Sequence, residues 1–324
     1  MQTVKFGKTG MEITPIGFGA WAIGGGGWAA AWGPQDDDEA VGAIRRAVEL
    51  GVNWVDTAAV YGLGHSEELV AQALKSVPES ERPYVFTKCS LVWDGGGDIS
   101  NVLEKDSVKR ECEESLRRLQ TDVIDLYQIH WPRPDEYIEE GWEAMAELKD
   151  EGKVRHIGVS NFDVSQMERI GEIAPVETLQ PPYNMLNRGV EEELLPYCGE
   201  NDIGVIVYSP MRSGLLTGKM TPERVANLPS DDWRRNAQDF QEPRLSRNLE
   251  LVELLEEIGA DHGFSPGEVA IAWTLRQPAV TAAIVGGRRP DQVDGIIGAA
   301  ELRLSEDELD RIESFLTQNP QGRL

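Results

Sequence analysis

Residues 123–130 read Val-Ile-Asp-Leu-Tyr-Gln-Ile-His, a short apolar run that ends in a histidine. Two earlier runs end in the same way: Asn53-Trp54-Val55-Asp56 ends in a carboxylate, and Tyr84-Val85-Phe86-Thr87-Lys88 ends in an ammonium. Short runs rich in β-branched and aromatic residues are typical of strands. Ionisable side chains at the carboxyl ends of successive parallel strands mark the functional face of a (β/α)8 barrel. These runs therefore predict such a barrel.

The rest of the chain has the alternation that this fold requires. Short apolar runs alternate with helical patterns, which indicates parallel strands joined by crossover helices. Eight strands are expected at 15–19, 53–56, 84–88, 123–130, 154–160, 178–180, 204–208 and 282–285. Helices are expected at 38–50, 66–75, 105–119, 135–151, 163–172, 190–200, 243–262, 265–276, after Pro290 and at 305–316. A small hairpin, residues 3–6 and 12–14, is expected to precede the barrel.

Two segments interrupt the alternation, and both follow the carboxyl end of a strand. One is the glycine- and tryptophan-rich run 24–33, and the other is the stretch 210–242. Long loops in a compact domain are usually functional or disordered. Neither resembles an interdomain linker, so residues 1–324 are expected to form a single α/β domain with its active site at the carboxyl ends of the strands.

Composition limits the possible function classes. The 324 residues are 40% hydrophobic and carry a net charge of −25. This charge argues against nucleic-acid and anionic-membrane partners, which require basic surfaces. Either it keeps the protein soluble, or it reflects adaptation to salt or to a cationic partner. The three cysteines do not have the spacing of a disulfide framework or a zinc site, so neither a metal nor disulfides are expected. With no secretory signal at the N-terminus and no apolar run of membrane-spanning length, a cytoplasmic location is expected.

The strand-end residues have complementary chemistry. Tyr61 follows five residues after Asp56 and could donate a proton to a carbonyl oxygen. A free tyrosine has a pKa of about 10, and a neighbouring Lys88, held by Asp56, is expected to lower it. His130 would orient the carbonyl oxygen. Alternatively, Lys88 could form a Schiff base, as in aldolase-type barrels. Cys89, which follows Lys88, is interpreted as a buried inert thiol rather than a redox group.

Five motifs, in order, resemble the aldo-keto reductase family over nearly the whole chain. They are Asp56-Thr-Ala-Ala-Val-Tyr61-Gly-Leu-Gly-His-Ser-Glu67, Thr87-Lys88, Gln128-Ile-His130-Trp131, Gly158-Val-Ser-Asn-Phe162, and Tyr208-Ser-Pro-Met211 followed by Gly214-Leu-Leu-Thr-Gly-Lys219. The runs 64–68 and 21–25 are similar to those of bacterial reductases of small aldehydes and sugars. The resemblance implies an oxidoreductase that uses NAD(P)H to reduce small aldehydes, ketones or sugars, with Asp56, Tyr61, Lys88 and His130 as catalytic residues.

The resemblance also implies a nicotinamide site at the barrel mouth. Ser160, Asn161 and Gln180 would hold the carboxamide, and Tyr208 would stack on the ring. Ser209, Pro210, Met211, Ser213, Leu215, Gly218 and Lys219 would line the pyrophosphate path. Gly19, Ala20 and Trp21 are expected to pass beneath the nicotinamide. Residues 17–22 also fit a loose dinucleotide-binding pattern, but the glycines that follow cannot open the helix that this motif requires.

The adenosine phosphate would lie near residues 284–292, with Gly286, Gly287, Arg288, Arg289 and Gln292 as its contacts. A guanidinium can pair with a 2′-phosphate, so NADPH is favoured and NADH is possible. The family often has Glu-Asn where this chain has Gly295 and Ile296. One adenine contact of the family is therefore expected to be absent.

Tryptophans are candidates for the substrate pocket. Trp21, Trp28, Trp32 and Trp131 are expected to form aromatic walls suited to a small carbonyl compound, although Trp28 and Trp32 could instead only fix the glycine-rich loop. A further alternative to the reductase is a non-enzymatic nicotinamide-binding redox sensor. The sequence gives neither the substrate nor the oligomeric state.

Overall fold

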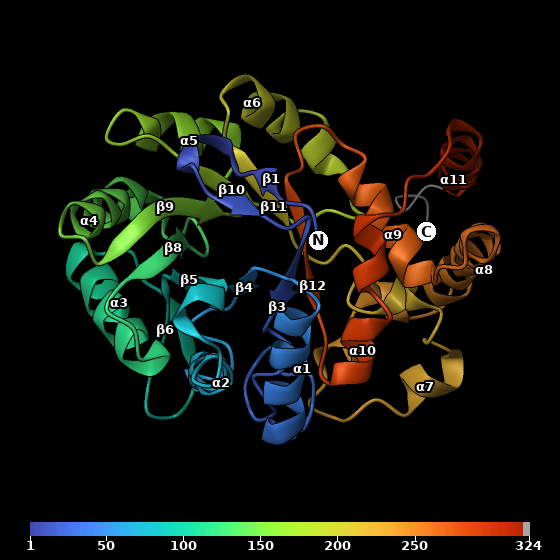
Figure 1. Cartoon of the computed structure of the whole chain (residues 1–324), viewed down its shortest axis with the longest axis horizontal. Helices are drawn as coiled ribbons and strands as arrows, with labels where there is room; N and C mark the ends of the chain where they lie inside the picture. Colours follow the sequence, from blue (N-terminus) through green and yellow to red (C-terminus); the bar gives the residue numbers. More distant parts are fainter. Residues whose placement is uncertain (320–324) are drawn as a thin grey trace.

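The computed structural model describes residues 1–319 and contains a closed barrel of eight parallel strands (Figure 1). In chain order the strands are β3 (Ile16–Gly19), β4 (Trp54–Asp56), β5 (Tyr84–Cys89), β8 (Ile124–Ile129), β9 (Val154–Ser160), β10 (Thr178–Gln180), β11 (Gly204–Val207) and β12 (Ala282–Gly286). The pairing of β12 with β3 closes the sheet. The predicted (β/α)8 fold is confirmed, with each strand boundary within one residue of its prediction.

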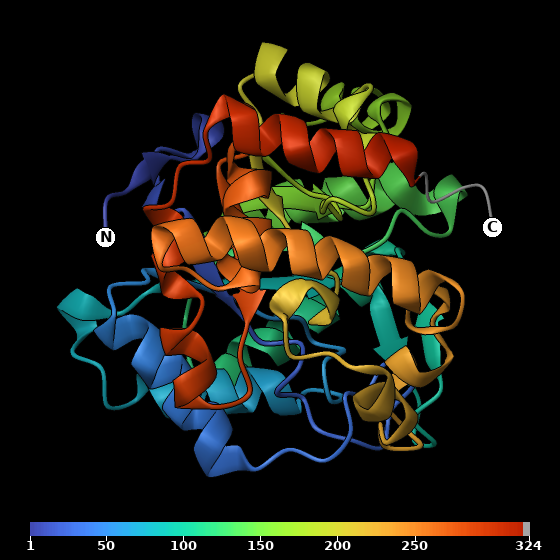
Figure 2. The same cartoon turned by 90° about the vertical axis from the view of Figure 1, so that its right-hand side faces the viewer.

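Helices surround the barrel (Figure 1). They are α1 (Asp37–Glu49), α2 (His65–Leu74), α3 (Lys105–Leu119), α4 (Ile138–Asp150), α5 (Val164–Gly171), α6 (Leu194–Glu200), α8 (Arg244–His262), α9 (Pro266–Leu275), α10 (Pro290–Asp294) and α11 (Glu306–Gln318). α1 shows why they form: Asp36 caps its first turn, and Ala40, Ile44 and Ala47 form one buried face. α11 lies alongside α8, and Arg311 pairs with Glu257 between them (Figure 2).

The expected N-terminal hairpin closes one end of the barrel. β1 (Val4–Lys5) pairs antiparallel with β2 (Glu12–Ile13). Phe6 is fully buried and packs with Trp54 and Phe86 from the barrel strands. Gly204 at the start of β11 is required here, because a Cβ at this position would lie 2.4 Å from the Phe6 ring. This end is thus filled by side chains, leaving the opposite end for a site.

Several elements differ from the sequence-based predictions. A two-stranded hairpin, β6 (Leu91–Trp93) with β7 (Ile99–Asn101), follows β5 and was not predicted. Its residues are half-exposed or exposed, so the runs lack the apolar signal of a barrel strand. The stretch 210–242 contains the short helix α7 (Pro222–Ala226) and three 3-10 turns. α4 and α6 begin later than predicted because 3-10 turns at 135–137 and 189–191 precede them.

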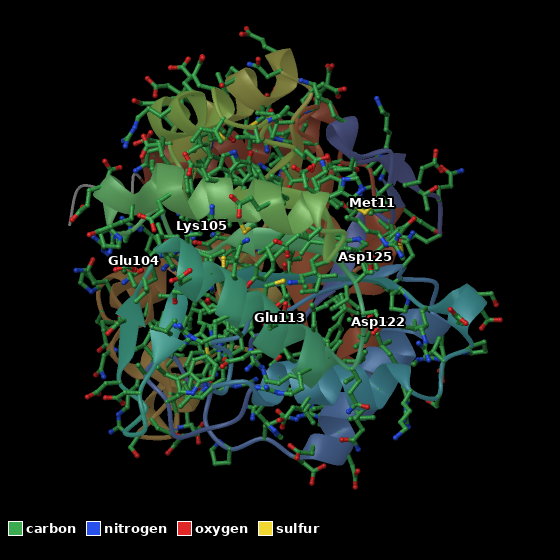
Figure 3. The ribbon with its side chains drawn as sticks, turned by 90° about the vertical axis from the view of Figure 1, so that its left-hand side faces the viewer. Met11, Glu104, Lys105, Glu113, Asp122 and Asp125 are labelled. Atoms are coloured by element: carbon green, nitrogen blue, oxygen red, sulfur yellow. The ribbon has the colours of Figure 1, made fainter. Side chains whose placement is uncertain are left out.

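The outer surface carries many charged side chains. Figure 3 shows the side of the barrel that carries α3, where side chains project from the helices, among them the labelled Lys105 and Glu113 of α3. Glu113 pairs with Lys153, and Lys105 pairs with Glu147. No helix within residues 1–319 is both long and apolar enough to cross a membrane.

Candidate active site

The carboxyl ends of β4 and β5 hold a buried ion pair. Asp56 is the last residue of β4, and Lys88 is the penultimate residue of β5. The Lys88 ammonium donates to Asp56 Oδ1 at 2.5 Å and to the Thr57 carbonyl oxygen at 2.8 Å. The Lys88 and Asp56 side chains are 0% and 3% exposed. Gln180 Nε2 donates to Asp56 Oδ2 at 2.8 Å, so the carboxylate is held from two sides.

Tyr61 and His130 lie above this pair. The Lys88 ammonium is 5.2 Å from the centre of the Tyr61 ring, and the His130 ring meets the Tyr61 ring edge-on at 5.7 Å. Tyr61 is positioned by the tight turn after β4, where the Tyr61 carbonyl oxygen accepts from the Ser66 N–H. Gly62 in this turn has a φ of +61° and lies against the backbone of Gly24. The structure therefore brings the four predicted catalytic residues together.

The expected effect of Lys88 on Tyr61 is wrong for this structure. Burial raises the pKa of Tyr61 well above its usual value, and the nearby Asp56 and Tyr208 add to the shift. Burial also lowers the pKa of Lys88, although Asp56 opposes that shift. Desolvation disfavours the charged forms of both groups, and the nearby Asp56 carboxylate further disfavours a phenolate at Tyr61. Tyr61 is accordingly a neutral phenol that carries a proton at neutral pH.

His130 is also neutral. Burial, and then the nearby Lys88 charge, lower its pKa well below the usual value. The backbone of His130 is fixed because its N–H donates to the Cys89 carbonyl oxygen and its own carbonyl oxygen accepts from Asn161 Nδ2. The buried Nδ1 atom has no hydrogen-bond partner within the described part of the chain. The imidazole thus retains hydrogen-bonding capacity at the site.

A cavity of about 1070 Å³ extends from these residues across the barrel mouth. Most of the predicted site residues line it: Gly19, Trp21, Trp28, Trp32, Asp56, Tyr61, His130, Trp131, Ser160, Asn161, Gln180, Tyr208, Ser209, Pro210, Met211, Ser213, Lys219, Gly286, Gly287, Arg288, Arg289 and Gln292. Lys88, Ala20, Leu215 and Gly218 are not among its lining residues. Lys88 lies beneath Tyr61, and Leu215 is fully buried in a cluster with Met220 and Phe240.

Polar side chains at the ends of β9, β10 and β11 form a hydrogen-bond chain. Tyr208, just after β11, donates its hydroxyl to Asn161 Oδ1 at 2.8 Å, and Asn161 Nδ2 donates to the His130 carbonyl oxygen at 2.9 Å. Ser160 Oγ donates to the Gln180 carbonyl oxygen at 2.8 Å. Asn161 adopts a φ of +64°, which asparagine tolerates better than most residues. This chain fixes one wall of the cavity beside His130.

Aromatic rings gather at the mouth of the cavity. Trp21 stacks on Tyr61 at 6.2 Å and meets Trp32 edge-on at 5.3 Å. Trp233 stacks on Trp21 at 5.7 Å, and the Arg234 guanidinium lies 4.3 Å from the centre of the Trp32 ring. The sequence prediction missed Trp233 and Arg234. Both lie in the stretch 210–242, which was predicted only as a long loop, because no local sequence pattern indicates that this loop folds back over residues 20–36.

Other lining residues were also missed. Eleven of them lie within segments that the sequence analysis assigned to the site or to its loops, but they were not named as contacts: Ala22, Ala30, Val60, Gly214, Thr217, Met220, Arg224, Ile284, Asp291, Gly295 and Ile296. The residues missed altogether are Gln35, Asp36, Glu39, Leu91, Ile99, Ser265 and Gly267. Leu91 and Ile99 come from the unpredicted β6–β7 hairpin. Apart from the acidic first turn of α1, which is an ordinary helix-start signal, nothing local in the sequence assigns them to a site.

The end of the cavity beyond β12 is cationic. Arg288 donates from Nη1 to the Trp32 carbonyl oxygen at 3.0 Å and from Nε to Gln35 Oε1 at 2.6 Å, and it also contacts the Pro34 carbonyl oxygen. Burial lowers the pKa of Arg288, with the Arg234 charge contributing. The neighbouring Arg289 is exposed and pairs with Asp291. Arg288 therefore ties the loop before α1 to the turn before α10.

The family model described as the Aldo/keto reductase family matches residues 15–317. The chain belongs to this family. It is 40% identical over 317 residues to Aldo-keto reductase YhdN of Bacillus subtilis, covering 98% of this chain and 94% of that protein. It is 34% identical over 319 residues to the NADH-specific methylglyoxal reductase of Escherichia coli, covering 94% and 95% of the two chains. The family assignment confirms the resemblance found in the sequence.

Solved structures agree with this aldo-keto reductase assignment. A glycerol dehydrogenase from Gluconobacter oxydans superposes with a TM-score of 0.89 at 36% identity, covering all of this chain and 97% of that one. An aldo-keto reductase from Bacillus halodurans, in its holo form, superposes with a TM-score of 0.80 at 27% identity, covering 97% and 96%. The protein is thus an oxidoreductase of a family that acts on carbonyl groups with nicotinamide cofactors. Within residues 1–319, no cluster of three or more side chains could hold a metal ion.

Proposed function

We propose that this aldo-keto reductase reduces the carbonyl group of small aldehydes, ketones or sugars, with NAD(P)H as the reductant and Tyr61 as the general acid. The observation that carries the proposal is the neutral Tyr61 phenol, which lines a large cavity directly above the Lys88–Asp56 pair and beside neutral His130. A general acid must be protonated in the resting state, and a phenol with its ordinary pKa of about 10 is protonated at neutral pH.

Proton transfer from Tyr61 to the carbonyl oxygen would leave a phenolate on the enzyme. The Lys88 ammonium, 5.2 Å from the ring centre, would stabilise this negative charge. Asp56 keeps Lys88 in place through the 2.5 Å contact. His130 would hydrogen-bond the carbonyl oxygen and orient it toward Tyr61, because its ring lies edge-on to the phenol at the cavity wall.

The cavity residues fit a nicotinamide dinucleotide. Two buried polar atoms of lining residues, His130 Nδ1 and Trp32 Nε1, have no partner within residues 1–319, and cationic side chains line the end away from Tyr61. Ser160, Asn161, Gln180 and Tyr208 would hold the nicotinamide end. Residues 209–219, with Gly286, Gly287, Arg288, Arg289 and Gln292, would hold the phosphates and adenosine. When bound, the reduced nicotinamide supplies the hydride.

NADPH is the proposed cofactor, with NADH accepted as well. Arg289 is exposed at the rim and could pair with a 2′-phosphate. NADH use is supported by three features: Arg288 already donates to the loop at 32–35, Gly295 and Ile296 replace the family's Glu-Asn, and a relative is named NADH-specific. The tryptophans at 21, 28, 32 and 131 would enclose a small carbonyl substrate. We further propose a cytoplasmic enzyme with one domain over residues 1–324.

The Schiff-base alternative conflicts with the position of Lys88. Its ammonium is fully buried and donates to Asp56 and Thr57 rather than facing the cavity. The redox-sensor alternative would use the same cofactor residues without turnover. Loss of cofactor oxidation in Tyr61→Phe, with unchanged NADPH binding, distinguishes the reductase from the sensor.

The test is oxidation of NADPH and of NADH by the purified protein across small aldehydes, ketoses and aldoses. We expect turnover with several aldehydes, and a drop of at least about a hundredfold in kcat for Tyr61→Phe, the usual contribution of a general acid. Trapping of substrate on Lys88 by borohydride, or tight NADPH binding with no turnover on the whole panel, would refute the proposal.

A further inference from the structure

Glu111 is a buried carboxyl group that the proposed reaction does not use. It lies in the middle of α3 on the face toward the barrel and is 5% exposed. Its oxygens accept from the Ser90 backbone N–H at 2.9 Å and from Ser107 Oγ at 3.2 Å. Within residues 1–319 it has these hydrogen-bond donors but no ion-pair partner, although burying an unpaired carboxyl group is costly. Such a cost suggests a specific role for the group.

Its partner Ser90 has an unusual backbone conformation. Ser90 follows β5 directly, is fully buried, and adopts a φ of +82°, in the left-handed region that favours glycine. A non-glycine residue there is strained, so its contacts must maintain this conformation. The Glu111 carboxyl accepts its N–H, and its carbonyl oxygen accepts from the Val102 N–H at 3.0 Å.

Ser90 in turn holds the residues that follow β8. Its Oγ accepts from the Trp131 N–H at 3.2 Å and lies 3.4 Å from the Trp131 carbonyl oxygen. The preceding Cys89 carbonyl oxygen accepts from the His130 N–H at 3.1 Å. His130 and Trp131 both line the cavity, and these contacts run through the two residues that follow Lys88 in sequence. A continuous chain of hydrogen bonds therefore connects Glu111 with the wall of the active site.

We infer that Glu111 is a positioning residue for carbonyl reduction: through Ser90, it sets the backbone of His130 and Trp131 and hence the substrate side of the cavity. This inference rests on the proposed function. This positioning role requires a hydrogen-bond acceptor for the Ser90 N–H and no charge. A neutral carboxyl group or an amide also provides an oxygen acceptor. The cofactor end of the cavity, beyond β12, lies outside this chain of contacts.

The surroundings of Glu111 agree with such a role. Burial raises its pKa to about 7, opposed by the Ser90 N–H, Ser107 and the Arg110 charge, whereas Glu114 adds to the rise. Cys89 from β5, Tyr127 from β8 and Cys112 from α3 face the same region, and burial raises the pKa of each of them. Arg110 is a cation near Glu111, but its guanidinium donates to Ser107 Oγ at 3.0 Å and forms no ion pair with Glu111 within residues 1–319.

Two substitutions at Glu111 test the inference against a matched control. Glu111→Gln keeps the acceptor and Glu111→Ala removes it. Glu113→Ala, on the same helix, loses only a surface ion pair with Lys153 (Figure 3). We expect Glu111→Ala to lower kcat/KM for an aldehyde about tenfold, because the Ser90 N–H loses its acceptor and even a small misplacement of groups at the reacting centre lowers the rate by such a factor. Glu111→Gln and Glu113→Ala are expected to stay within about twofold of wild type, and the NADPH Kd of all three should be unchanged.

A double-mutant cycle tests whether Glu111 acts through Ser90. Ser90→Ala removes the Oγ contact to Trp131, so Glu111→Ala combined with Ser90→Ala should lower kcat/KM no further than the worse single variant. Additive losses, or an equal loss in Glu111→Gln, would overturn the inference. So would a Glu111→Ala variant that is less stable but keeps the wild-type kcat/KM.

A spectroscopic measurement separates this inference from the proposed function. In protein labelled with 5-fluorotryptophan, the Trp131 fluorine resonance, assigned with Trp131→Phe, should shift in Glu111→Ala and stay in place in Glu111→Gln. If the wild-type protein reduced no carbonyl compound, the proposed function would fail, yet this resonance would still report whether Glu111 positions Trp131. An unmoved resonance in Glu111→Ala would overturn the positioning role even in an active enzyme.

Discussion

Replacing Asp56 with asparagine removes one charge of the buried pair beneath Tyr61 and leaves the other in place. The introduced side chain would retain one oxygen for the Lys88 ammonium, but its amide nitrogen would face Gln180 Nε2, which now donates to Asp56 Oδ2 at 2.8 Å. Both ion-pair side chains are almost fully buried, so water compensates poorly for the lost partner. The variant therefore contains an uncompensated ammonium and two donors that point at each other.

The magnitude follows from this burial. Breaking a buried ion pair by removing one partner costs about 3–5 kcal/mol of unfolding free energy, which for 324 residues at about 2.1 cal/mol/K of unfolding entropy per residue corresponds to a fall in Tm of roughly 4–7 °C. The pH dependence has a definite sign. The pKa of Lys88 is already lowered in the folded protein, and without Asp56 it falls further. The unfolded state then binds more protons between this lowered pKa and the ordinary value, so the stability of Asp56→Asn rises with pH across that window.

Thermal and urea unfolding of three variants measure the effect. Asp56→Asn combined with Lys88→Met removes the ammonium as well, so it should recover much of the loss and lose the pH dependence. Glu113→Gln, which breaks the exposed pair with Lys153, is the control and should leave Tm nearly unchanged. A wild-type Tm in Asp56→Asn, or a double variant less stable than Asp56→Asn, would refute the reasoning.

Three further predictions concern single sites. The pKa of Glu111 rises from 4.5 to about 7 on folding, so its stabilising contribution is present below pH 4.5 and is lost as pH rises through 7. Glu111→Gln should therefore be more stable than wild type at pH 8 by up to about 3 kcal/mol, from 1.36 kcal/mol per pKa unit over the difference between 4.5 and 7. A difference in unfolding free energy between the two proteins that stays constant from pH 5 to pH 8 would contradict this. Gly62→Ala would place a Cβ 2.0 Å from the Gly24 carbonyl oxygen and should lower kcat by displacing Tyr61, whereas Gly10→Ala, also at positive φ but with open space around its Cβ, should affect kcat little. Arg288→Ala releases the loop at 32–35 and should weaken binding of NADH as well as of NADPH in fluorescence titrations; weaker NADPH binding alone would assign Arg288 only to the 2′-phosphate.

The barrel could be predicted because its signals are local. Each strand is a short apolar run, and the residue at its end, such as Asp56 or His130, immediately follows that run in sequence. The β6–β7 hairpin gave no comparable signal, because its partly exposed residues at 91–93 and 99–101 pack on the mouth and not in the core. The approach of Trp233 to Trp21 depends on how two loops fold over the barrel, which no single stretch of sequence encodes.

The direction of the Tyr61 pKa shift shows a further limit of sequence reasoning. The sequence places an ammonium near a phenol, and for an exposed pair that would favour the phenolate. The opposite result depends on how completely the surrounding chain excludes water, and this follows only from the assembled structure.

Charged side chains of both signs occur on the outer helices and in the cavity. The net charge is −25, and acidic side chains of the outer helices pair with nearby cations, as Glu147 does with Lys109 and Glu139 with Arg169. The cavity is lined by five cations, Lys219, Arg224, Arg234, Arg288 and Arg289, and by the carboxylates of Asp36, Glu39, Asp56 and Asp291. An anionic cofactor would thus approach a repulsive surface and gain attraction only within about a Debye length, roughly 8 Å at physiological salt, of the cavity cations. Recognition of the cofactor then depends on short-range contacts inside the cavity. The acidic exterior does not attract the cofactor, and this supports solubility as its role.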